Sequence, residues 1–147
     1  MNTSKIKGCT LIEVMVTIII IAILASVATA AYRGYITKAR RQAMQEDLLT
    51  MQQEAEEYYS LNHKYLGAFG TSTEVTSKTI DGRNSFYTVT YCASGCTPSD
   101  TVTGGYIITA VAKGGQTSDK DCSTLRVYRN GTRLAETSAG AKSEGCW

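Results

Sequence analysis

An uncharged apolar run near the amino end constrains the fold more than any other feature of this chain. The nineteen residues between Glu13 and Arg33 carry no charge and consist mainly of Ile, Ala and Val. A helix rises about 1.5 Å per residue, so such a run crosses most of a hydrocarbon core about 30 Å thick. No proline interrupts residues 9–61. The sequence therefore predicts a membrane-spanning helix over residues 9–32 and a globular part over residues 33–147.

The helical pattern continues beyond the apolar run, to about Leu61. Apolar residues there fall mostly three or four positions apart, which makes one stripe: Ile36, Ala39, Ala43, Met44, Leu48, Met51, Ala55 and Tyr58. We expect one continuous helix whose second half packs on the chain's own sheet. Its charges are segregated, with Arg33, Lys38, Arg40 and Arg41 before Glu46, Asp47, Glu54, Glu56 and Glu57. This order fits either pairing between axially staggered subunits or a solvated face with pairs four residues apart.

The remainder of the chain has the pattern of strands. Residues 67–85 are rich in Gly, Thr, Ser and charge, which predicts a loop. β-branched or alternating runs follow at residues 86–92, 106–112, 125–129 and 132–135. Asn130 and Gly131 between the last two runs predict a two-residue hairpin turn. We expect an α+β fold, with an antiparallel sheet of three or four strands packed on the second half of the helix.

The cysteines indicate an oxidising compartment. Cys9 borders the apolar run, and four more follow it at Cys92, Cys96, Cys122 and Cys146. Four cysteines in a small domain beyond a membrane segment suit two disulfides, and three pairings are possible. A zinc site is disfavoured because paired C-x-x-C knuckles are missing and His63 is the only histidine. The sequence predicts no metal and no cofactor.

The residues before the apolar run form a short basic leader. Residues 1–8 are polar and include Lys5 and Lys7, which favour a cytoplasmic amino end, whereas the four basic residues after the run argue for the reverse. An ordinary secretory signal is cut after its apolar region, and Ala28-Thr-Ala30 loosely fits such a site. A conventional signal peptide is therefore an alternative.

Glu13 stands where a charge is costly, at the edge of the apolar run. A carboxylate at a bilayer edge requires a cationic partner. Cleavage after Gly8 would supply one, since the new amine of Cys9 would lie close to one helical turn from Glu13. The pairing can form within one subunit or between neighbouring subunits, and either would neutralise a charge that lipid cannot solvate.

The segment Gly8-Cys9-Thr10-Leu11-Ile12-Glu13, with the basic leader before it and the apolar run after it, resembles the class III signal of type IV prepilins. The resemblance implies cleavage after Gly8 by a prepilin peptidase, N-methylation of Cys9, and assembly with other pilin subunits through Glu13. It also implies a type IV pilin fold, held by a single pass in the inner membrane with a periplasmic head, and later built into an extracellular pilus.

The later part of the chain is similar to minor pilins of the PilE kind, in Tyr58–Asn62, Tyr65–Ala68, Tyr106–Ala110, Asp121–Leu125, Asn130-Gly131 and Cys146-Trp147. In such pilins a disulfide ties the C-terminal segment to the sheet. This implies pairs Cys122–Cys146 and Cys92–Cys96, and the main rival is Cys92–Cys146 with Cys96–Cys122.

Three residues depart from the pilin pattern. Cys9 replaces the usual Phe, Ala22 stands where many members have Gly, and Ala30 stands where many have Pro. Loss of both helix breakers predicts a straighter helix. Acylation of Cys9, as in a lipoprotein, is disfavoured because the apolar run follows the cysteine instead of preceding it.

The head raises the question of a surface ligand. Arg126, Arg129, Arg133 and Lys142 with Tyr128 between them allow a DNA-binding surface, although a soluble strand face is the favoured interpretation. The formal net charge of +2 indicates no particular partner. P-loop, H-E-x-x-H and G-x-S-x-G motifs are missing, so no catalytic residue is predicted. We therefore expect a structural subunit and not an enzyme, a minor pilin of a type IV pilus. The alternatives are a DNA-uptake receptor pilin and a pseudopilin of a type II secretion machine.

Overall fold

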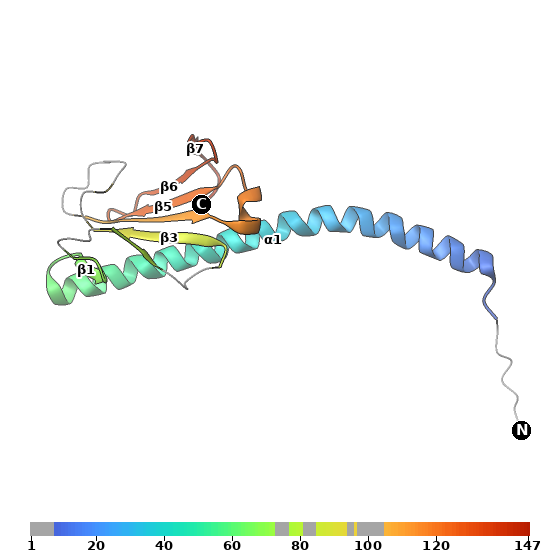
Figure 1. Cartoon of the computed structure of the whole chain (residues 1–147), viewed down its shortest axis with the longest axis horizontal. Coiled ribbons are helices and arrows are strands. Elements are labelled where there is room, and N and C mark those ends of the chain that lie inside the picture. The colour runs from blue at the N-terminus through green and yellow to red at the C-terminus, as the bar shows by residue number, and fades with distance from the viewer. Residues whose placement is uncertain (1–7, 73–76, 81–84, 94–95, 97–104) are drawn as a thin grey trace, which may run out of the picture. The chain divides into compact units, whose positions relative to one another are not determined.

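One long helix and an antiparallel sheet make up the fold. The structure is a computed structural model that describes residues 8–72, 77–80, 85–93, 96 and 105–147. The chain divides into two units, residues 1–36 and 37–147. Helix α1 (Leu11–Asn62) runs through both, and in the second unit the strands lie beside it (Figure 1). The expected α+β fold with one continuous helix is confirmed.

The first unit is a helix that presents apolar side chains on all sides. From Leu11 to Val27 the large apolar side chains are exposed by 47–81%. By length and composition α1 could cross a membrane. Because apolar side chains are unfavourable in water, this surface is suited to lipid or to packing against other apolar helices.

Three hydroxyl side chains within the apolar part of this unit bond to the helix itself. The hydroxyls of Thr17, Ser26 and Thr29 donate to backbone carbonyls three or four residues earlier, at 2.8, 2.7 and 2.8 Å. A hydroxyl bonded in this way can enter an apolar medium without an unpaired donor.

A left-handed residue ends the helix. His63 has φ 55°, and its N–H donates to the carbonyl of Tyr59 at 2.7 Å. The chain then turns back through Gly67, which has φ 111°. A Cβ at Gly67 would lie 2.1 Å from the hydroxyl of Tyr58, so both the backbone conformation and the space require glycine here.

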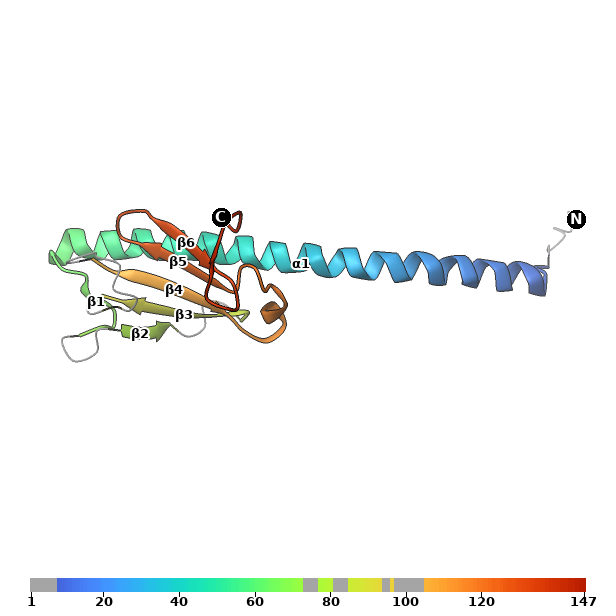
Figure 2. The same ribbon diagram turned by 90° about the horizontal axis from the view of Figure 1, so that it is seen from above.

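Within the described residues the sheet has six strands, in the order β2-β3-β4-β5-β6-β7, and every neighbouring pair is antiparallel. Figure 2 labels β2 to β6 in this order. The expected runs form its four central strands: β3 (Tyr87–Cys92), β4 (Ile107–Ala112), β5 (Thr124–Tyr128) and β6 (Arg133–Glu136). The edge strands β2 (Ser77–Ile80) and β7 (Lys142–Ser143) were not predicted, so the expected count of three or four strands is too low.

Part of the segment expected to be a loop forms strands. Within residues 67–85, β1 (Leu66–Phe69) follows the helix and β2 pairs with β3, while residues 73–76 and 81–84 lie outside the described residues. β2 reads Ser-Lys-Thr-Ile and lacks an alternating apolar pattern. Its strand conformation comes from backbone pairing at the sheet edge, which the sequence pattern does not reveal.

The connection between β5 and β6 is longer than two residues. Residues 129–132 separate the strands, and the N–H of Tyr128 donates to the carbonyl of Thr132 at 3.0 Å. The side-chain oxygen of Asn130 accepts the N–H of Thr132 at 2.9 Å, and Gly131 has φ 82°. Asn130 and Gly131 do lie in the turn, and the Asn130 side chain hydrogen-bonds within it, but the turn is longer than the two residues expected.

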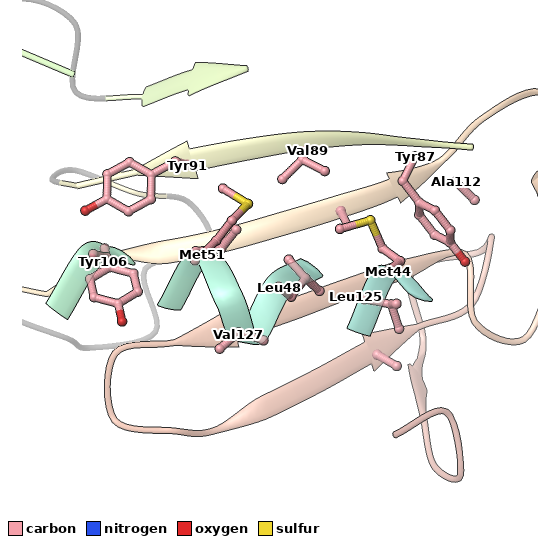
Figure 3. Packing of buried hydrophobic residues seen from close by; sticks show 14 of the residues in the cluster. Met44, Leu48, Met51, Tyr87, Val89, Tyr91, Tyr106, Ala112, Leu125 and Val127 are labelled. Atoms are coloured by element: carbon pink, nitrogen blue, oxygen red, sulfur yellow. The ribbon is translucent and has the colours of Figure 1, made fainter. Parts of the chain in front are cut away.

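The core lies between α1 and one face of the sheet (Figure 3). Met44, Leu48 and Met51 of the predicted stripe are fully buried, whereas Ala43 is exposed. The strands alternate, with inward side chains buried against the helix: Tyr87, Val89, Tyr91, Tyr106, Ile108, Ala110, Leu125 and Val127. The opposite face of the central strands is rich in threonine.

Candidate functional site

The predicted processing site lies directly before the helix. Gly8 and Cys9 precede α1, and Cys9 is an exposed free cysteine. Its thiol donates to a carboxylate oxygen of Glu13 at 3.4 Å. The structure therefore brings together Cys9 and Glu13, the two residues that the sequence connects through the cost of a carboxylate beside the apolar run.

The first turn of the helix also shows a role that the sequence interpretation missed. The N–H of Glu13 donates to the hydroxyl of Thr10 at 3.4 Å, and the N–H of Val14 donates to the carbonyl of Thr10 at 3.3 Å. Thr10 thus caps the helix, with Glu13 at the third helical position. This is the Thr-x-x-Glu pattern of a capping box, a signal that was present in the sequence. Glu13 therefore takes part in the helix cap, and its role in assembly stays a prediction.

Two disulfides cross-link the second unit. Cys92 is bonded to Cys96, four residues away, and Cys122 to Cys146, 24 residues away. The amide of Gln45 on α1 donates to the carbonyl of Cys146. The second disulfide therefore fixes the C-terminal segment both to the start of β5 and to the helix.

A buried polar cluster holds the helix where it enters the head. The side chain of Gln116, in the short helix η1 (Gly114–Ser118), is fully buried and donates to the carbonyl of Thr37 at 3.1 Å and to the hydroxyl of Tyr87 at 3.0 Å. Arg41 on α1 lies 3.4 Å from the carboxylate of Asp119 and also contacts the sulfur of Cys122. Burial raises the pKa of the Tyr87 phenol, so this group stays protonated. The sequence offered no sign of this cluster, because its bonded members are up to 81 residues apart.

Tyrosines fill the other end of the head. Tyr65 and Tyr106 both donate to the carboxylate of Glu56, at 2.9 and 3.0 Å. Burial, followed by the bond to Glu56, raises the pKa of both phenols above its ordinary value. Burial likewise raises the pKa of the Tyr91 phenol, which donates to the carbonyl of Tyr65. The protonated phenols satisfy Glu56 without a cation.

The four basic residues proposed for DNA do not form one cluster. Arg126 is on the face of the sheet that points away from the helix, where it is bonded to Glu136, and Lys142 is opposite Glu136 on that face. Arg133 is opposite the buried Val127, on the helix side. Tyr128, expected among the basic residues, is buried and cannot stack on a base. The DNA-binding surface that the sequence allows, with all four basic residues around Tyr128, is therefore not formed.

Arg129 and Arg133 instead lie over aromatic rings on the helix side. The Cζ of Arg129 is 5.2 Å from the centre of the Tyr65 ring and 5.9 Å from that of Tyr59. The Cζ of Arg133 is 5.6 Å from the centre of the Trp147 ring. Both arginines are exposed, so their guanidinium N–H groups can reach a ligand while the rings restrain the side chains.

The charge segregation along α1 is partly used inside the head. Arg40 lies 3.8 Å over the Phe86 ring and Arg41 pairs with Asp119, while Glu56 accepts the two phenols. Lys38 and Glu46 remain exposed. Arg40, Arg41 and Glu56 at least thus serve packing within one chain.

Comparison with known proteins agrees with both ends of this description. Residues 3–29 match the prokaryotic N-terminal methylation motif. Residues 30–126 match the family described as type IV minor pilin ComP, DNA uptake sequence receptor. No solved structure matches the chain.

Curated relatives are pilins of Neisseria. The chain is 39% identical over 107 residues to type IV major pilin protein PilE1 of Neisseria gonorrhoeae. These residues make up 65% of this chain and 62% of that protein. It is 46% identical over 81 residues to a fimbrial protein of Neisseria meningitidis serogroup A. These residues make up 54% of this chain and 45% of that protein. The chain thus spans about half to three fifths of the length of these relatives. With its methylation motif, its long helix and the match over residues 30–126, the chain belongs to the type IV pilins, in the family described as type IV minor pilin ComP, DNA uptake sequence receptor.

Proposed function

We propose that this chain is a minor pilin that is processed and built into a type IV pilus. In this proposal a prepilin peptidase removes residues 1–8 and the new amino group of Cys9 is methylated. Residues 9–32 hold the subunit in the inner membrane by a single pass, with residues 33–147 as the periplasmic head. After assembly the same helix lies in the filament core, and the head faces the outside.

The apolar surface of the first unit is the observation that carries this proposal. Its side chains point outward around the whole helix and its hydroxyls are bonded internally, so the segment suits lipid and packed helices equally. The match to the methylation motif covers part of the leader and most of this segment. A subunit that exchanges one apolar surrounding for another can move from membrane to filament without exposing this surface to water.

Processing tests the proposal. Mass spectrometry of the protein purified from its own cells should find a chain that begins at Cys9 and carries a methyl group on its amine. The unprocessed chain, from cells that lack the prepilin peptidase, is the control and should keep its leader. A mature protein that begins at Met1, or at Ala31 after the alternative signal-peptide site, would contradict the assignment.

A second function, the capture of DNA, is supported by one specific observation. The family that matches residues 30–126 is described as a DNA uptake sequence receptor. A pilin with a DNA-binding head would bring DNA to the cell surface as part of the pilus. The exposed arginines of the head can supply the cationic groups that phosphates require.

DNA binding can be measured directly. The full-length chain in a non-ionic detergent should raise the fluorescence anisotropy of a labelled DNA duplex. The affinity should fall steeply as salt rises from about 50 to about 200 mM, because phosphate contacts release counterions. Poly-glutamate at equal charge should compete poorly, since its carboxylates lack the spacing of a DNA backbone. If poly-glutamate competes as well as unlabelled DNA does, or if no binding is seen, the DNA role is wrong and the pilus role stands.

A further inference from the structure

The hairpin that joins β5 to β6 carries a surface with the chemistry of a phosphate site. We define the hairpin surface as Arg129 and Arg133 with the rings beneath them, Tyr59, Tyr65 and Trp147. All but Tyr59 and Tyr65 follow the segment that matches the DNA receptor family, residues 30–126. The inference therefore comes from contacts of this chain, although it rests on the proposed capture of DNA.

Both arginines of the hairpin surface are on the same side of the sheet. Arg133 is opposite Val127, whose side chain is buried toward α1, and Arg129 reaches over Tyr59 on that helix. The two arginines are four positions apart, one at each end of the turn between β5 and β6. Both guanidinium groups therefore lie on the helix side of the sheet, whereas that of Arg126 is half-buried and bonded to Glu136 on the opposite face.

The rings beneath the arginines restrain them before a ligand arrives. An arginine side chain loses considerable rotamer freedom when it binds, and a guanidinium group already resting on an aromatic face has lost part of it. Both side chains are exposed, and although Arg129 also hydrogen-bonds to the phenol of Tyr65, a guanidinium group has further N–H donors for a ligand. A planar guanidinium group can donate two parallel hydrogen bonds to a phosphate, which an ammonium group cannot.

The same rings are poorly placed to read bases. Tyr65 is 5% exposed and stacks on Tyr59 at 4.5 Å between ring centres, while Tyr59 and Trp147 are half-buried. A base needs a free aromatic face to stack on. The nearby Glu56 carboxylate accepts hydrogen bonds from two phenols and keeps its negative charge.

We propose that the hairpin surface binds the phosphate backbone of DNA through Arg129 and Arg133. It contributes affinity and salt dependence, and it contributes no sequence preference, because phosphates carry no sequence information. Any preference for a particular sequence comes from other residues of the head.

Two double variants, each of which removes two positive charges, test this assignment. Arg129→Gln with Arg133→Gln should weaken binding of the full-length chain to a duplex of random sequence by about tenfold or more at about 100 mM salt. The slope of log affinity against log salt should become shallower by about 2, close to 0.9 for each phosphate that the variant no longer neutralises. The affinity ratio between any preferred duplex and a random one should stay the same. Arg126→Gln with Lys142→Gln removes the same charge from the opposite face and should change the slope much less.

A double substitution by lysine separates the effect of side-chain geometry from the effect of charge. Arg129→Lys with Arg133→Lys should keep most of the slope but lose affinity, since lysine makes a single contact and rests less well on the rings. If the wild-type chain binds DNA and the glutamine pair on the hairpin leaves the slope unchanged, the hairpin assignment is wrong and the DNA role stands. If the wild-type chain binds no DNA but the glutamine pair lowers incorporation into pili, the surface contacts another protein, and both the DNA role and this inference fail.

Discussion

Replacing Cys122 and Cys146 with serine should lower the free energy of unfolding of the head by about 3 kcal/mol, because the disulfide closes a loop that spans 24 residues. Chain entropy is the larger part of this effect, because the open chain gains conformations that the disulfide forbids. The folded state is also weakened, since Arg41 lies against the sulfur of Cys122 and Gln45 donates to the carbonyl of Cys146. Urea unfolding of the full-length chain in detergent, followed by the fluorescence of the single tryptophan, Trp147, measures the change.

Two other cysteine variants make this prediction specific. Cys92→Ser with Cys96→Ser opens a loop of only four residues and should cost less, about 2 kcal/mol. Cys9→Ser changes a free thiol before the helix and should leave head stability unchanged. Equal unfolding midpoints for wild type and the Cys122/Cys146 variant would show that packing alone holds the C-terminal segment.

The sequence predicted the elements whose signals are local. The helix was predictable because its apolar run, its stripe and the missing proline all lie within one continuous segment. The four central strands were predictable because β-branched runs alternate over several residues. The edge strands were not, since the strand conformation of Ser77–Ile80 depends on pairing with β3, and the two residues of β7 depend on pairing with β6.

The site was predictable only where its residues are neighbours in the chain. Gly8, Cys9 and Glu13 share one motif, and the structure places them at the start of one helix. The environments of the head's basic residues depend on the fold. Arg126 and Arg133 are seven residues apart, yet they project from opposite faces because they belong to different strands with different register. Sequence spacing could not distinguish the arginine that pairs with Glu136 from the one that lies over Trp147.

Glu13→Ala should reduce incorporation of the subunit into pili by about tenfold or more, while export, cleavage after Gly8 and folding of the head continue. In a monomer this carboxylate can stay near the lipid headgroups. In a filament of packed apolar helices water is scarce, and the amine of a neighbouring Cys9 at the right height is the partner that the proposal assigns to it. Breaking a buried ion pair costs about 3–5 kcal/mol, and about 1.4 kcal/mol already corresponds to a factor of ten.

A weakened helix cap is a second explanation for an assembly defect of Glu13→Ala. Two further variants separate it from loss of the charge. Thr10→Ala removes the hydroxyl that accepts the N–H of Glu13 but keeps the carboxylate, at a cost of about 1 kcal/mol to the start of the helix. Glu13→Gln keeps a side chain that suits a capping box but removes the charge. If the charge directs assembly, Glu13→Gln should resemble Glu13→Ala, and Thr10→Ala should resemble wild type.

The measurement compares two fractions from the same cells. Each variant is expressed at a matched level, and its amount in sheared pili is divided by its amount in the membrane. A low ratio for both Glu13 variants, with a normal ratio for Thr10→Ala, assigns the effect to the carboxylate. A low ratio for Thr10→Ala and a normal one for Glu13→Gln would assign it to the helix cap instead. Equal ratios for all variants would mean that this subunit enters the filament without using Glu13, because removing a required charge pair could not leave the assembly equilibrium unchanged.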